Sequence, residues 1–137
     1  MDIEYAVLAD YAEMVGGKLY IMGGGWDTST QATLPAQLRI GIAVGVRIGW
    51  EETNQQLPIK VLIEDDDGLE LVRIDGQINI GRPPNLPPGA TQLAQMAANV
   101  PLNIVSYGGF RIVVSAGEGP SAASDRVLPF RIVSGRP

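Results

Sequence analysis

The stretch LRIGIAVGVRIGW, residues 38–50, alternates between large apolar residues and residues of other kinds. Every second position from Leu38 to Trp50 is leucine, isoleucine, valine or tryptophan. The positions between them are Arg39, Gly41, Ala43, Gly45, Arg47 and Gly49. A period of two residues is typical of a β-strand, whose successive side chains point to opposite faces. The stretch therefore predicts a strand with one hydrocarbon face and one nearly bare face.

The bare face contributes little to a core, so we expect a second layer to cover it. That layer is either another part of the same chain, in a tight internal contact, or a second subunit. The arginines near its two ends indicate partial exposure there. The candidate interface residues are Arg39, Gly41, Ala43, Gly45 and Arg47.

More alternating segments follow this strand. Residues 57–80 predict a hairpin around Asp67-Gly68. The register that keeps apolar residues on one face pairs Ile63 with Val72, Val61 with Ile74 and Lys60 with Asp75. RPPNLPPG, residues 82–89, cannot be a central strand, because proline donates no ladder hydrogen bond, so we expect a crossing between sheets there.

Three more segments with alternating apolar residues complete the chain. Residues 96–104 alternate again, although TQLAQMAA, residues 91–98, could equally begin as a helical turn. The last two predicted strands are Phe110–Ala116 and Val127–Val133, joined by GEGPSAASD, residues 117–125.

The composition agrees with an all-β protein. The 137 residues fit one domain, and Gly 17 and Pro 10 favour many short elements separated by turns. We predict a single domain over residues 1–137, an antiparallel two-sheet sandwich of immunoglobulin-like or jelly-roll type with about eight strands. A closed β-barrel is the alternative.

Charge and residue types exclude several classes of function. A net charge of −5 without clustered basic residues disfavours nucleic-acid binding. The chain has no cysteine and no histidine, which removes disulfides, zinc fingers, thiol nucleophiles and imidazole chemistry. We expect no cofactor. The amino terminus does not resemble a signal peptide, and the longest apolar run is too short to span a membrane, so we expect a soluble cytoplasmic protein.

GKLYIMGGGWD, residues 17–27, runs from a predicted strand into three glycines and a tryptophan. Gly16-Gly17 predicts a hairpin turn that pairs residues 3–14 with residues 19–26. This pairing sets Asp10 opposite Gly23, among apolar side chains, where backbone N–H groups could satisfy the carboxylate. On the other face, the Trp26 indole could lie over bare glycine backbone. We therefore predict a structural role for Asp10, Gly23, Gly24, Gly25 and Trp26.

The segment YAVLADYAEMVGGKLYIMGGGWD, residues 5–27, resembles the opening of a family of small bacterial proteins of unknown function. The later GGFRIVV and LPFRIV are similar to that family's closing hairpin. The resemblance implies a β-sandwich fold and a bacterial setting. It implies no activity and no functional residues.

Three groups of side chains are candidate sites. EDDDG, residues 64–68, could hold Ca²⁺, but its carboxylates lack the spacing of a calcium loop, so a solvated acidic turn is favoured and no metal is expected. Asp10 would need Asp27 or Glu13 as a second acid to act as a hydrolase, and a structural role is favoured. The rings of Tyr5, Tyr11, Tyr20 and Trp26 could stack on a sugar, although core packing is more common.

The leading functional hypothesis is a non-enzymatic module that binds another protein, as part of a homo-oligomer or of a bacterial or phage-encoded assembly. The alternative is a domain that binds a carbohydrate or another small molecule, and the third hypothesis is a hydrolase that uses Asp10. A flat apolar strip without a cleft would favour the first hypothesis, and a pocket lined by aromatic rings the second.

Overall fold

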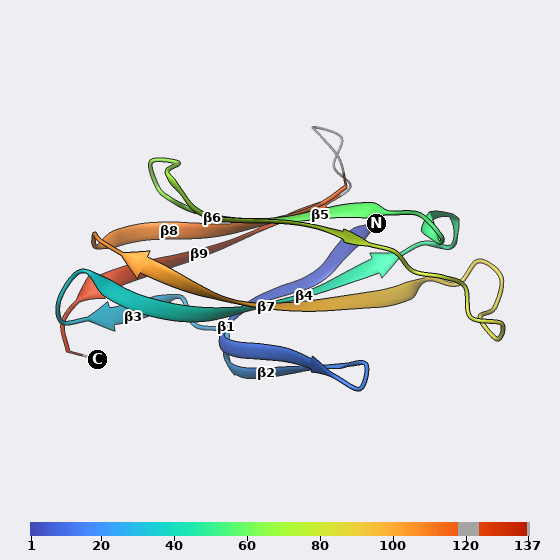
Figure 1. The fold of residues 1–137 in the computed structure, drawn as a ribbon, viewed down its shortest axis with the longest axis horizontal. Helices are drawn as coiled ribbons and strands as arrows, with labels where there is room; N and C mark the ends of the chain where they lie inside the picture. The colour runs from blue at the N-terminus through green and yellow to red at the C-terminus, as the bar shows by residue number, and fades with distance from the viewer. Residues whose placement is uncertain (118–123, 137) are drawn as a thin grey trace.

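The computed structural model describes residues 1–117 and 124–136 and shows a sandwich of two β-sheets (Figure 1). In chain order the elements are β1 (Asp2–Val15), β2 (Lys18–Gly24), β3 (Thr28–Gln31), β4 (Ala36–Ile48), the 3₁₀ helix η1 (Trp50–Glu52), β5 (Leu57–Asp65), β6 (Glu70–Ile78), β7 (Gln92–Ile104), β8 (Gly108–Ala116) and β9 (Ser124–Ser134). The four-stranded sheet has the order β2-β1-β4-β7, and the five-stranded sheet has the order β3-β9-β8-β5-β6.

The predicted two-sheet sandwich is confirmed, and the strands in the described residues form two open sheets rather than a closed barrel. The described residues form nine strands, one more than about eight, because the short β3 was not predicted. Its sequence TSTQ has no apolar alternation, so periodicity does not reveal it. β3 pairs with β9 in parallel, which makes the five-stranded sheet mixed, whereas the remaining strand pairs are antiparallel as expected.

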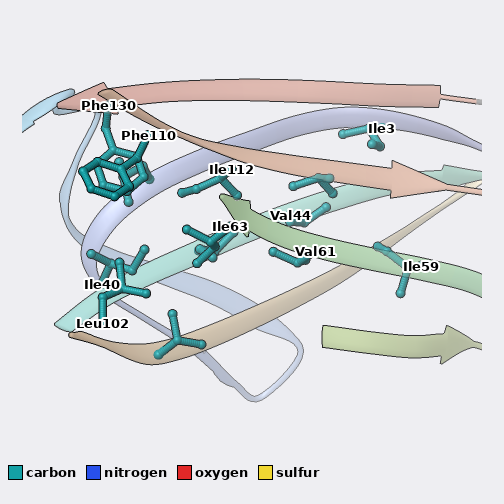
Figure 2. Close-up of a cluster of buried hydrophobic side chains, with 14 of the residues drawn as sticks. Ile3, Ile40, Val44, Ile59, Val61, Ile63, Leu102, Phe110, Ile112 and Phe130 are labelled. Atoms are coloured by element: carbon teal, nitrogen blue, oxygen red, sulfur yellow. The ribbon is translucent and has the colours of Figure 1, made fainter. Parts of the chain in front are cut away.

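The core lies between the two sheets. The even-numbered residues of β4 from Ile40 to Ile48 are at most 1% exposed and face the inner side chains of β5 and β8. Figure 2 shows Val44, Ile63 and Ile112 converging in this layer, with Phe110 and Phe130 together at one end. The two phenyl rings are stacked with centroids 5.4 Å apart. Each fully buried side chain of this kind stabilises the fold by about 1.5–3 kcal/mol, so the alternation of β4 is a large determinant of stability.

The predicted hairpin register is confirmed from Leu57 to Ile63, with Ile63 paired with Val72, Val61 with Ile74 and Lys60 with Asp75. It shifts by one residue next to the turn, where Glu64 pairs with Glu70, so the turn is longer than the predicted two-residue loop. The proline segment is also confirmed as the crossing between sheets, since it joins β6 to β7. Its first residue, Arg82, lies over the Trp50 ring, 4.0 Å from the centroid, and its Nε donates a hydrogen bond to Thr53 Oγ1 (2.6 Å).

The segment that could begin as a helical turn is strand, because β7 pairs with β4 without interruption from Gln92 to Ile104. The strand predicted over residues 38–50 ends at Ile48, and Trp50 begins η1. Most of the predicted loop at residues 117–125 lies outside the described residues. Within the described ranges, the chain has no helix that is long and apolar enough to cross a membrane.

Candidate functional site

The β1–β2 hairpin extends beyond the four-stranded sheet as an arm, defined here as residues 10–23. β1 pairs with β4 as far as Ala9 opposite Gly41, and from Tyr11 to Val15 it pairs only with β2. The turn is at Gly16-Gly17, as predicted, and both glycines have positive φ (57° and 77°) that suits a two-residue turn. Figure 1 shows this hairpin on the outer side of the sheet formed by β1, β4 and β7.

The arm changes direction just after Ala9. The Leu8 carbonyl accepts a hydrogen bond from Gly25 N–H (2.9 Å), so it points toward the β2 side. Four residues later, Ala12 N–H donates to Asn99 Oδ1 (3.1 Å) and Ala12 O accepts from Asn99 Nδ2 (2.7 Å). In a regular strand, residues 8 and 12 would point the same way. The strand is therefore irregular between them, where the pairing skips Asp10 and Gly23 and Gly23 has φ 64°.

The arm crosses the outer face of the sheet directly over Gly41. A Cβ at this position would lie 2.8 Å from backbone atoms of Tyr11 and Ala12, closer than any ordinary contact. The Asn99 side chain, which projects from β7, holds the crossing in place from the other side. The glycine of the bare face is therefore required for the close approach of two backbones.

The bare face of β4 is covered by the chain's own amino-terminal segment. Gly41, Ala43 and Gly45 are buried, and the Tyr5 ring occupies the space above Gly45. Tyr5 OH also donates a hydrogen bond to Gln95 Oε1, and burial, followed by the nearby Glu4 charge, raises the pKa of Tyr5. Of the two alternatives for this face, internal covering is confirmed.

This corrects the list of candidate interface residues. The centre of the strip is not accessible to another molecule, because Gly41 lies beneath the arm, Gly45 lies beneath Tyr5, and Ala43 between them is buried. Only the ends reach solvent, as expected: Arg39 is exposed, and Arg47 is half-buried and forms an ion pair with Glu4 (2.9 Å).

A group of exposed apolar side chains lies on the outer face of the arm. Tyr11 pairs with Met22, and Glu13 with Tyr20, so these side chains share one face. Tyr11 is 39% exposed, Tyr20 50% and Met22 65%. Tyr11 OH donates to Glu13 Oε2 (2.9 Å), and this hydrogen bond and the charge of Glu13 raise the pKa of Tyr11. The opposite face of the arm includes Ala12, which is fully buried.

Asp10 differs from the sequence expectation. Its carboxylate lies in the space that a Gly23 Cβ would occupy, so glycine does make room for it. The side chain is exposed, however, because β1 stops pairing with β4 at Ala9, one residue before Asp10. It accepts no hydrogen bond from the residues that the structure describes. Asp10 is therefore a solvated carboxylate rather than an acceptor in a dry site.

Trp26 also differs from the sequence expectation. Its ring packs edge-on against Phe130, with centroids 6.4 Å apart, and the space above Gly24 is taken by Val7 and Ile21. The indole Nε1 is buried without a hydrogen-bond partner among the described residues. Of the four rings considered for sugar stacking, Trp26 and Tyr5 are thus packed against the protein, and Tyr11 and Tyr20 share the arm.

A carboxylate of the acidic turn at residues 64–68 accepts hydrogen bonds from the backbone of the turn itself. Asp65 Oδ1 accepts hydrogen bonds from the N–H groups of Asp67 (2.9 Å) and Leu69 (2.8 Å), and the Asp66 carboxylate lies against Gly109. In residues 1–117 and 124–136, no group of three or more acidic side chains is placed to hold a metal ion.

Sequence reasoning missed a groove between the free edges of the two sheets. It has a volume of about 400 Å³ and is lined by Met14 and Gly17 of the arm, by residues of β6 and by Leu93 and Met96 of β7. A larger hollow of about 700 Å³ lies on the outer face of the five-stranded sheet, beside Lys60 and Arg73. Residues far apart in sequence form both, so no local pattern could have indicated them.

A known structure shares the architecture. A glycosyl hydrolase family 2 member from Bacteroides cellulosilyticus DSM 14838 aligns with 93% of this chain at 5% identity and a TM-score of 0.52, over 15% of its own length. A β-glucuronidase from glycoside hydrolase family 2 aligns with 69% of this chain at 17% identity and a TM-score of 0.44, over 10% of its own length. The chain thus spans only a small part of these enzymes, and the first likeness indicates a shared fold.

No curated protein matches the sequence. Residues 4–128, which include the arm, β4 and most of both sheets, match a family described as "Family of unknown function (DUF6941)". The match covers most of the chain and agrees with the resemblance found in residues 5–27. The protein therefore belongs to DUF6941, a family of unknown function.

Proposed function

We propose that this protein is a non-enzymatic interaction module that assembles with a second copy of itself through the β1–β2 arm. The observation that carries the proposal is the outer face of the arm, where Tyr11, Tyr20 and Met22 are exposed side by side. Contiguous exposed apolar side chains on a soluble domain are typical of interaction sites, and tyrosine and methionine are enriched at such sites.

The way the arm is held supports the same function. The Asn99 hydrogen bonds and the close contact with Gly41 hold the arm against the sheet. A surface that is ordered before binding loses little conformational entropy when a partner docks. The exposed residues are thus presented on a rigid support.

The test is the mass in solution. We expect the wild type to have about twice the 14.6 kDa of one chain in light scattering at about 0.1 mM. Met22→Lys places a charge in the apolar face and should give a folded monomer. Leu69→Lys is the matched control, since Leu69 is 67% exposed and Met22 65%, but Leu69 lies in the β5–β6 loop away from the arm. A monomeric wild type, or equal effects of the two substitutions, would contradict the proposal.

Small-molecule binding is the second candidate, favoured by the groove between β6 and β7. Its volume of about 400 Å³ falls within the usual range for ligand sites, and its lining is mostly apolar with the amides of Gln77 and Gln95. The probe is 8-anilinonaphthalene-1-sulfonate, whose fluorescence rises in apolar sites. Under this candidate Leu93→Glu abolishes the signal, whereas Val127→Glu, outside the groove, leaves it unchanged. Equal signals from both variants would remove this candidate.

Sugar binding is the other form of this candidate. It is supported only by the exposed Tyr11 and Tyr20 rings on the arm. Stacking on a sugar would change the surroundings of these rings, so titration with a soluble oligosaccharide should change their fluorescence spectrum. An unchanged spectrum would remove this form.

A further inference from the structure

The free edge of β2 has backbone groups that point away from β1. Ala12 N–H and C=O are both engaged by Asn99, so they point away from β2. Ala12 pairs with Ile21, and in an antiparallel ladder both members of such a pair point outward. Ile21, and by alternation Leu19, therefore direct N–H and C=O away from β1. β2 has no second neighbouring strand in the described part of the sheet.

The edge of β2 is less protected than the other three edges that the two sheets have in the described residues. Edge strands usually avoid pairing with other chains by being short, by carrying charges or by containing proline. β3 has four residues, β6 carries exposed charged side chains at Arg73 and Asp75, and Pro101 interrupts the donors of β7. β2 has one charge, Lys18, at its first residue, and the rest of the strand is uncharged.

The edge is also complementary to itself. In an antiparallel pairing centred on Ile21, Tyr20 faces Met22 of the second copy, and Lys18 and Leu19 lie toward its Gly24 and Gly23, where the strand is irregular. The two strands then meet with their outward-pointing residues opposite each other. No like charges are opposed, and each tyrosine ring meets a methionine sulfur, a favourable contact. Registers centred on Tyr20 or Leu19 leave part of the strand unpaired.

We propose that two copies join by pairing β2 with β2 about a two-fold axis at Ile21, which continues the four-stranded sheet from one copy into the next. This proposal rests on the self-association proposed above and gives it a geometry. A two-fold arrangement uses the same surface on both copies and closes after two subunits. It also brings Tyr20 and Met22 of both arms into one apolar surface.

The chain has no cysteine, so single introduced cysteines report the register. At Ile21 the two Cα atoms would be about 5.5 Å apart, within the range of a disulfide. We therefore expect Ile21→Cys to form a covalent dimer under mild oxidation, seen on a non-reducing gel. Leu19→Cys is the control, because the two copies of residue 19 would be separated by four residues along the strand, about 14 Å.

A mixed sample gives a second check. Tyr20→Cys and Met22→Cys should each remain largely uncross-linked alone and cross-link when combined, because these positions face each other only across the axis. Circular dichroism confirms that each variant is folded. Equal cross-linking of Ile21→Cys and Leu19→Cys, or none from the mixture, would overturn the register. If the wild type is dimeric but no cysteine in β2 cross-links, this geometry is wrong and the self-association proposal survives; a monomeric wild type overturns both.

Discussion

Gly41→Ala tests the crossing of the arm over the sheet. The added methyl carbon would lie 2.8 Å from Tyr11 and Ala12 backbone atoms, whereas ordinary contacts begin at 3.4 Å. The arm must therefore move outward by at least about 0.6 Å. That movement stretches the two hydrogen bonds between Ala12 and Asn99, now 3.1 and 2.7 Å long. Backbone cannot move aside as a flexible side chain does, so the substitution should lower the free energy of unfolding.

The magnitude follows from three effects. Overpacking costs about 1–3 kcal/mol, and each lost hydrogen bond to Asn99 adds about 0.5–1.5 kcal/mol. Replacement of a strand glycine by alanine works in the other direction by about 0.4–1 kcal/mol, because it restricts the unfolded chain. We expect Gly41→Ala to lower the free energy of unfolding by about 1–5 kcal/mol, depending on how far the two hydrogen bonds are lost.

The assay is urea unfolding, with hydrogen exchange of the arm amides as a local measurement. Gly76→Ala is the control, because its new Cβ would meet only Ile59 Cγ2 at an ordinary 3.6 Å. The control should be as stable as the wild type or slightly more so. In Gly41→Ala the arm should exchange faster than the core. If both variants unfold at the wild-type urea concentration, the arm does not press on Gly41 and the account of the bare face is wrong.

Two further predictions follow from single side chains. Asn99→Ala leaves the buried Ala12 N–H and C=O without partners and should cost about 1–3 kcal/mol in urea unfolding, with faster exchange in the arm; unchanged exchange would show that Asn99 does not hold it. Partial burial tends to raise the pKa of Glu52, but hydrogen bonds from the Met1 amino group and Gly49 N–H outweigh it and lower the pKa below 4.5. A carboxyl whose pKa is lowered by folding stabilises the fold above pH 4.5, and this stabilisation is lost as the pH falls through the pKa of the folded state. The difference in unfolding free energy between wild type and Glu52→Gln should therefore shrink in acid. A difference that stays constant with pH would contradict this assignment.

The sequence by itself predicted the two-sheet sandwich and much of the strand pairing. The alternation from Leu38 to Ile48 requires one buried face, and a shift of one residue would turn that face to solvent, so pattern and register are linked. The same reasoning was sufficient for the β5–β6 register from Leu57 to Ile63 and for the Gly16-Gly17 turn, but not for the bulge beside the β5–β6 turn. β3 escaped prediction because it is held by backbone pairing with β9 and has no apolar pattern.

Which surfaces are free was decided only by the tertiary structure. The bare face of β4 and the apolar residues of the arm are both visible in the sequence, but periodicity does not say which layer covers which. An irregularity at Asp10 and Gly23 turns the arm across the sheet. There Ala12 contacts Gly41, 29 residues later in the chain, and Asn99, 87 residues later, and these contacts hold the arm in place. The arm thereby buries Gly41 and leaves Tyr20 and Met22 in solvent. Local sequence specifies which side chains share a face of a strand, whereas long-range packing specifies whether that face meets protein or water.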